Sequence, residues 1–249
     1  MSAPTVPLDR RSALLTIVDI VIAPNAAFDR LRAAPTWVWA FIVAALLAVV
    51  GSLLSQPAMM HALQTSMPAQ LAASPQIAKL PPDQQQRMIA LQLRVMRTMF
   101  SLLWLIVPVV ILIIGLIQAL IMLIANAVGR GSAGFKQYFA LSMNAAVVGS
   151  GLAGLVIGII VMMRGAGSFE TTSAVQSVLP SLALLAPGAR GALAGFLAAI
   201  NVFSVWAAVL LALGMCRMGR VAAAPAWIAA ALFVLSTATF SAFGAAQQR

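Results

Sequence analysis

The sequence predicts an all-α, polytopic integral membrane protein, and both its composition and the placement of its charges indicate this class. Of the 249 residues, 62% are hydrophobic and only 8% are charged, whereas soluble domains are roughly half apolar and about a quarter charged. Five apolar stretches, each at least nineteen residues long, contain no Asp, Glu, Lys, Arg or His. Each could cross about 30 Å of hydrocarbon as a helix. Since backbone groups in lipid must be paired, helices are the expected structure.

The N-terminal segment, residues 1–36, is expected to lie on the cytoplasmic side with one or two short helices at the membrane interface. Arg10 and Arg11 precede an apolar run over 13–23 that Asp19 interrupts, and Pro24 then begins a second helix. A cleaved signal peptide is the alternative interpretation, because a basic start and an apolar core are present. The acid inside the apolar core and the lack of an A-x-A site argue against cleavage.

Residues 37–246 are predicted to form one membrane domain of five helices. The predicted spans are 37–55, 99–128, 139–163, 192–216 and 221–246. The second span is longer than one bilayer needs and contains Pro108, which predicts a kinked or tilted helix.

Two large extracytoplasmic loops are predicted, at 56–98 and 164–191. The first part of 56–98 is rich in Pro, Gln, Ser and Met and is expected to be irregular. A helix is expected from Pro81-Pro82-Asp83, because proline fits the first helical turn and an acid there complements the helix dipole. This helix is expected to run into the second span with an apolar stripe at helical spacing. The stripe comprises Met88, Leu91, Val95, Met96 and Met99.

Five spans place the two termini on opposite sides of the membrane. An N-terminus inside leaves eight basic residues on the cytoplasmic side and seven outside. The eight lie in shorter segments close to the spans, where basic residues determine orientation. The expected location is therefore the inner membrane with a cytoplasmic N-terminus.

Charge and residue usage exclude several classes of function. The net charge is +10, but the basic residues lie in short groups between apolar runs, so nucleic-acid binding is not expected. Cys216 and His61 are the only residues of their types, and all five acids lie outside the predicted spans. Proton relays, intramembrane proteolysis and clustered metal sites need more ionisable groups than these. No enzymatic activity, catalytic residue, metal or cofactor is expected.

Gly129, Gly131 and Gly134 match the spacing of a dinucleotide-binding loop. That motif requires a preceding strand and an acid about twenty residues further on, and neither is expected here. These glycines are instead predicted to form a tight turn between the second and third spans.

Small residues recur every fourth position in the third span, which predicts close packing against a neighbouring helix. This row comprises Ser142, Ala146, Ser150, Gly154 and Gly158, and a weaker row in the fourth span comprises Ser204, Ala208 and Ala212. Packing within the chain is favoured, with binding of a partner protein as the alternative. The amides of Gln118, Asn144 and Asn201 are expected to bond between helices, and the alternative is that they line a polar path.

Three sequence patterns together resemble the bacterial five-span branch of the Yip1 family over residues 20–240. They are the run from Ile22 through Pro24 and Phe28 to Pro35 and Trp37, the glycine turn at Gly131 followed by Phe135-Lys136-Gln137, and Asn201 with Phe203 and Trp206. The resemblance implies a five-helix fold with a cytoplasmic N-terminus. It also implies a role like that of bacterial relatives that accompany ABC-type exporters as accessory subunits.

The resulting hypothesis is a non-enzymatic accessory or scaffold subunit of an export or envelope-maintenance complex. Its expected partners are membrane lipids and other membrane proteins, including an ABC-type exporter, and self-association is left open. The alternative is a transporter or scramblase for lipids or apolar small molecules, because an apolar groove needs no charge in the membrane. The family-motif and packing residues are Pro24, Phe28, Pro35, Trp37, Gly131, Phe135, Ser150, Gly154, Gly158, Asn201, Phe203 and Trp206.

Overall fold

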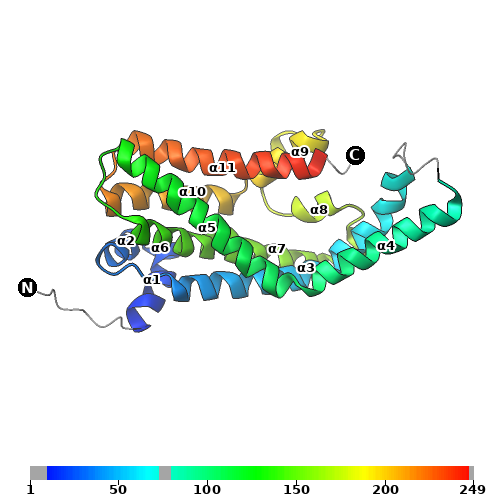
Figure 1. The fold of residues 1–249 in the computed structure, drawn as a ribbon, viewed down its shortest axis with the longest axis horizontal. Helices are drawn as coiled ribbons and strands as arrows, with labels where there is room; N and C mark the ends of the chain where they lie inside the picture. Colours follow the sequence, from blue (N-terminus) through cyan, green and yellow to red (C-terminus); the bar gives the residue numbers. More distant parts are fainter. Residues whose placement is uncertain (1–9, 73–79, 247–249) are drawn as a thin grey trace, which may run out of the picture. The chain divides into compact units, whose positions relative to one another are not determined.

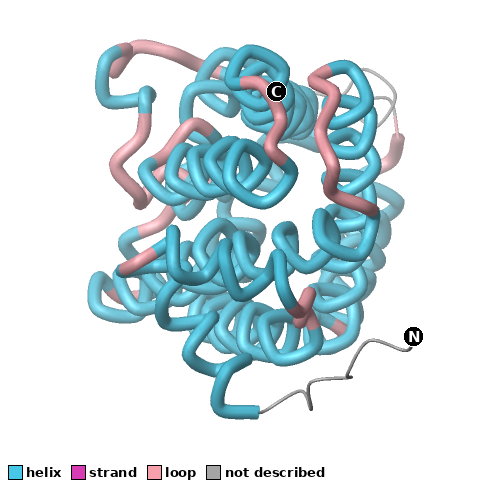
Figure 2. The backbone as a smooth tube through the Cα atoms, turned by 90° about the vertical axis from the view of Figure 1, so that its left-hand side faces the viewer, coloured by secondary structure: helices cyan, strands magenta, loops and turns pink. Residues whose placement is uncertain are grey.

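The computed structural model describes residues 10–72 and 80–246, and within them the regular structure is helical (Figures 1 and 2). The described part holds no strand, and its β-type pairing is a bridge between Ser181 and Asn201. The helices are α1 Arg10–Ile22, α2 Pro24–Ala33, α3 Val38–Ala72, α4 Pro82–Ser101, α5 Leu103–Val128, α6 Phe135–Ala146, α7 Ala153–Arg164, α8 Thr172–Gln176, α9 Gly191–Ala199, α10 Val202–Gly219 and α11 Ala223–Ala246. The predicted all-α class is confirmed.

Five helical segments in the described residues are long and apolar enough to cross a membrane. They are Val38–Ser66, Leu103–Val128, Phe135–Arg164, Val202–Gly219 and Ala223–Ala246. The third consists of α6 and α7 joined by a π-helical segment, Val147–Leu152. The number and order of these segments agree with the sequence prediction.

The first part of the 56–98 loop is helical, so the expectation of irregular structure there is wrong. α3 continues without a break to Ala72, although Pro57 lies within it. The hydroxyl of Ser55 donates to the carbonyl of Gly51 at 2.8 Å and therefore does not compete with the helix. Ala58 and Ala62 are buried. Tertiary burial therefore outweighs the local preference of a proline-containing segment.

The helix predicted from Pro82 is confirmed as α4, which is separated from α5 by a single residue, Leu102. Pro108 lies inside α5, as expected. Proline at the start of α4 has no N–H to leave unpaired, and Asp83 lies in the first turn.

The fourth apolar stretch is broken in two, in contrast to the continuous helix expected over 192–216. α9 ends at Ala199 and α10 begins at Val202. At the break the Leu182 N–H donates to the Ile200 carbonyl at 3.1 Å, and the Val202 N–H donates to the Pro180 carbonyl at 3.4 Å. Backbone groups freed by the interruption are therefore paired with the preceding loop.

The chain divides into two compact units. Unit 1 is 1–46, 109–152 and 203–234, and unit 2 is 47–108, 153–202 and 235–249. The core of unit 1 contains Ile20, Phe28 and Leu31 of the N-terminal helices together with Tyr138 and Leu141 of α6. A core cluster of unit 2 contains Ala58, Val161, Phe169 and Val175.

Candidate functional site

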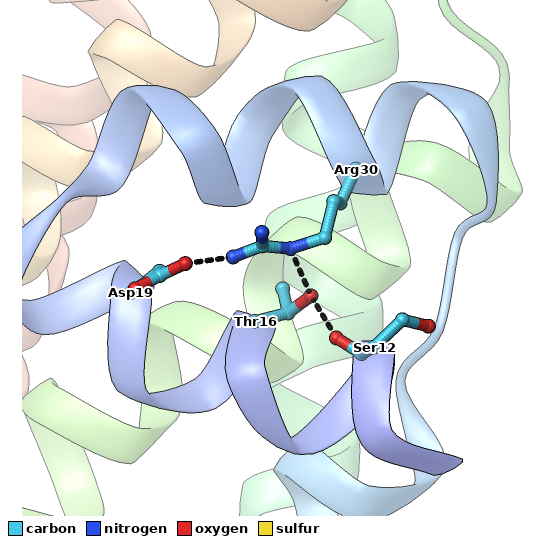
Figure 3. Close-up of polar contacts among 4 residues, drawn as sticks. All are labelled: Ser12, Thr16, Asp19 and Arg30. Atoms are coloured by element: carbon cyan, nitrogen blue, oxygen red, sulfur yellow. Dashed lines mark hydrogen bonds and ion pairs between the residues drawn. The ribbon is translucent and has the colours of Figure 1, made fainter. Parts of the chain in front are cut away.

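The two N-terminal helices are joined by a polar cluster within unit 1 (Figure 3). Arg30 of α2 forms an ion pair with Asp19 of α1, and its Nε donates to the Thr16 hydroxyl at 3.1 Å. The Thr16 hydroxyl donates in turn to the Ser12 carbonyl at 2.7 Å. Charges removed from water need such partners. The ion pair with Arg30 thus explains why Asp19 is tolerated within the apolar run of α1.

A second ion pair connects α2 to the end of α10. The Arg217 guanidinium donates to both Asp29 carboxylate oxygens, at 3.0 and 2.9 Å. These hydrogen bonds hold the pKa of Asp29 below its usual value. Both side chains are about half exposed, at 52% for Arg217 and 55% for Asp29, so the pair is screened by solvent and contributes little stability.

The N-terminal family-motif residues pack within unit 1. Pro24 begins α2, and Phe28 is fully buried. Pro35 lies in the link between α2 and α3, where the Asn144 side-chain amide donates to the Thr36 carbonyl at 3.1 Å. The Trp37 ring centroid lies 5.2 Å from that of Phe139. These residues hold the link against α6.

Phe135 begins α6 and stacks on Phe139, with ring centroids 5.9 Å apart. Trp37 therefore joins an aromatic cluster with both residues, since it contacts the same Phe139 ring. Aromatic pairs of this kind add roughly 0.5–1.5 kcal/mol beyond the area that they bury.

Gly131 lies in the turn between α5 and α6, which confirms the turn predicted from the glycine spacing. A Cβ atom at this position would come within 2.2 Å of the Asn126 side-chain oxygen. The Tyr138 hydroxyl donates to that same oxygen at 2.6 Å, and the Asn126 amide donates to the Gly131 carbonyl at 3.3 Å. The glycine therefore makes room for a buried amide.

The contribution of Asn126 and Tyr138 was not recognised in the sequence. Both are buried, at 8% and 0% exposure. The sequence signal for this contact is the position of the two residues: Asn126 lies about one helical turn before the glycine turn, and Tyr138 lies about one helical turn after it.

Gly154 and Gly158, the last two residues of the small-residue row in the third span, pack against α3 within unit 2. A Cβ atom on Gly158 would lie 2.6 Å from the Gly51 carbonyl oxygen, and one on Gly51 would lie 2.1 Å from the Gly154 carbonyl oxygen. The two backbones are thus too close for any side chain between them. Ser150 is half-buried in the π-helical segment, and Ser142 is fully buried in α6.

The weaker row in the fourth span also packs within unit 1. Ala208 and Ala212 of α10 form a buried cluster with Ala230 of α11. Asn201 lies at the break between α9 and α10, and its amide donates to the Ala199 carbonyl at 3.4 Å. Phe203 and Trp206 are partly buried against the core of unit 1.

The family-motif residues are thus divided between the two units, and the contacts described above are packing contacts. No group of three or more His, Cys, Asp or Glu side chains that could hold a metal ion occurs in the described part of the chain. α4 has no buried residue and carries a row of exposed apolar side chains.

These features define the class of the molecule, an all-α polytopic membrane protein. The chain is 29% identical over 127 residues to the membrane protein YknW of Bacillus subtilis strain 168. The aligned part covers 51% of this chain and 51% of that protein, so the match spans about half the length of each. No protein-family model matches the chain, and no solved structure matches it significantly.

Proposed function

We propose that this protein is a non-enzymatic, Yip1-like accessory or scaffold subunit of an ABC-type export or envelope-maintenance complex in the inner membrane. Its N-terminus is assigned to the cytoplasm. The observation that carries the proposal is the exposed apolar face of α4, which lies outside the candidate spans. Similarity to a protein named as a membrane protein supports the same general setting.

The α4 face comprises four apolar side chains spaced three or four residues apart. Met88, Leu91, Val95 and Met99 are 43%, 55%, 48% and 49% exposed. This spacing places them along one side of the helix. An exposed apolar row on a helix is the pattern used in helix-in-groove binding, and methionine adapts readily to the shape of a partner.

A second apolar row on α4 is less exposed than the first. Ile89, Leu93, Met96 and Phe100 are half-buried. The row of Met88, Leu91, Val95 and Met99 is the more exposed of the two, and it is called the open row below. Burial of the open row against a partner would stabilise a complex by about 25 cal/mol per Å² of apolar area, before the costs of association.

Arginines determine which partner suits this face. Arg87, Arg94 and Arg97 lie along the polar side of α4, and Asp83 is the only acid in the helix. Arg87 and Arg94 border the open row, so a second copy of this chain would bring like charges to the edge of the contact, which disfavours pairing. A different membrane protein with an apolar groove bordered by acids is the better fit.

The double substitution Leu91→Gln and Val95→Gln tests this proposal. We expect the tagged variant to recover at least about tenfold less of an ABC-type exporter subunit from native membranes in mild detergent, because an anchor residue typically contributes more than 1 kcal/mol. Recovery is measured by quantitative mass spectrometry. The matched control is Leu14→Gln with Val18→Gln, two apolar residues of α1 that are also four residues apart and are 48% and 54% exposed.

The proposal would be contradicted if the wild type and the α4 variant recovered equal amounts of the exporter subunit. Purification of the wild-type chain without any other membrane protein would also contradict it. Movement of a labelled lipid by the purified chain in vesicles would instead favour the transporter or scramblase alternative.

A further inference from the structure

A cavity of about 560 Å³ lies in unit 2 and is lined by residues of α8, the loop that follows it, α9 and the C-terminal end of α11. Figure 1 labels these helices. This volume falls within the roughly 300–1,000 Å³ range of small-molecule sites. None of the family-motif residues lines it.

The walls of the cavity are held in place by contacts far apart in the sequence. The Thr65 hydroxyl donates to the Glu170 carbonyl at 3.1 Å, and Phe169 and Val175 are buried against Ala58 and Val161. The Ser181–Asn201 bridge holds the other end of the loop. A long connection that is anchored at both ends is typical of functional loops.

α9 and α11 form a tight wall on the opposite side. A Cβ atom on Gly195 would lie 2.7 Å from the Ser241 carbonyl oxygen and 2.6 Å from the Ala245 Cβ. The two helices are therefore in direct contact, and this wall of the cavity is formed by closely packed helices.

The lining combines one cation with uncharged polar groups. Arg190 is the only charged residue among the lining residues, and no carboxylate is present. In the described part of the chain, its guanidinium makes no hydrogen bond or ion pair. Ser173, Gln176 and Ser177 also line the cavity. The Ser173 hydroxyl is hydrogen-bonded to that of Thr171 at 3.0 Å, and the Ser177 hydroxyl donates to the Ala174 carbonyl at 3.2 Å. This set suits an anionic group that carries further oxygen atoms.

The level of the cavity relative to the membrane indicates which anion it would meet. Ala245 lines the cavity and is the second-last residue of the candidate span Ala223–Ala246. The end of a span lies at the level of the lipid headgroups. Leu184, which lines the cavity, and the adjacent Leu185 are both largely exposed, and apolar side chains at this level suit contact with acyl chains.

We propose that this cavity binds the phosphate-bearing headgroup of an anionic phospholipid, with Arg190 contacting the phosphate and the serine and glutamine side chains contacting the polar headgroup. Binding of this lipid does not require that α4 has a partner.

The purified full-length chain in neutral nanodiscs tests the proposal by titration with a labelled phosphatidylglycerol. The expected result is saturable binding that is at least about tenfold weaker in Arg190→Gln, since loss of a charge-assisted contact to phosphate commonly exceeds 1.4 kcal/mol. The matched control is Arg164→Gln, an exposed arginine of unit 2 that does not line the cavity, which should bind like the wild type. Ser173→Leu, which fills part of the cavity without changing the charge, should also weaken binding.

Equal binding by the wild type and Arg190→Gln would overturn the proposal, as would equal binding of phosphatidylethanolamine. Full competition by inorganic phosphate at the same concentration would also overturn it, because the site would then recognise a free anion.

Discussion

At the scale of single residues, the Asn126–Tyr138–Gly131 contacts show how one polar group is accommodated in an apolar core. The Asn126 side chain accepts from the Tyr138 hydroxyl and donates to the Gly131 carbonyl. The surrounding residues of unit 1 are largely apolar, so an unpaired amide there would be costly.

Substitution Tyr138→Phe is expected to destabilise the protein by about 1–3 kcal/mol, because the Asn126 oxygen loses its donor and stays buried. The measurement is thermal unfolding in detergent. Tyr138→Phe combined with Asn126→Leu should recover part of the loss by removing both polar groups. An unchanged melting temperature in the single variant would contradict this account of the turn.

The residue scale also shows what the sequence could not reveal. The glycine turn was predictable because Gly129, Gly131 and Gly134 are local. The pairing of Asn126 with Tyr138 depends on a contact twelve residues away, and the pairing of Arg217 with Asp29 joins residues 188 apart. Spacing along the chain carries no direct information about such contacts.

At the scale of elements, the approach of α7 to α3 depends on glycine in both helices. Without a hydrophobic drive between helices in lipid, association relies on close packing of small residues. The row on the third span was predictable from its period of four. On α3, Ala48 and Gly51 meet the glycines of α7. They belong to a row of small buried residues, Ala44, Ala48, Gly51 and Ser55, whose spacing of three and four residues is less regular.

Substitution Gly51→Ala is expected to lower the melting temperature by several degrees, because its Cβ would meet the α7 backbone and overpacking costs about 1–3 kcal/mol. Gly244→Ala is the matched control, since it is also helical and a Cβ there meets nothing within 4 Å. It should be neutral or slightly stabilising. Equal effects of the two substitutions would refute the close helix contact.

The ends of helices were predictable where nearby residues determine them, and not where contacts with distant residues determine them. Proline at 81–82 marks the start of α4 correctly. The continuation of α3 to Ala72 depends on the burial of Ala58 and Ala62, and the break between α9 and α10 depends on pairing with residues 180–182. Neither could be read from the residues at the boundary itself.

At the scale of the whole molecule, the apolar runs carry most of the information about the fold. Five charge-free stretches predict five candidate spans, and their order agrees with the structure. The candidate site was only partly predictable. The apolar stripe of α4 is visible in its spacing, but its exposure and the cavity at Arg190 follow from burial in three dimensions.

The central claim is that the chain crosses the membrane five times, and cysteine labelling in intact cells tests it most directly. In a Cys216→Ser background, single cysteines are placed at Gln84, Ser132, Ser173 and Ala222, one in each connection between the candidate spans. The account predicts that an impermeant reagent labels the cysteines at 84 and 173 from outside, and those at 132 and 222 only after the membrane is opened. Labelling of two successive connections from the same side would contradict the five crossings.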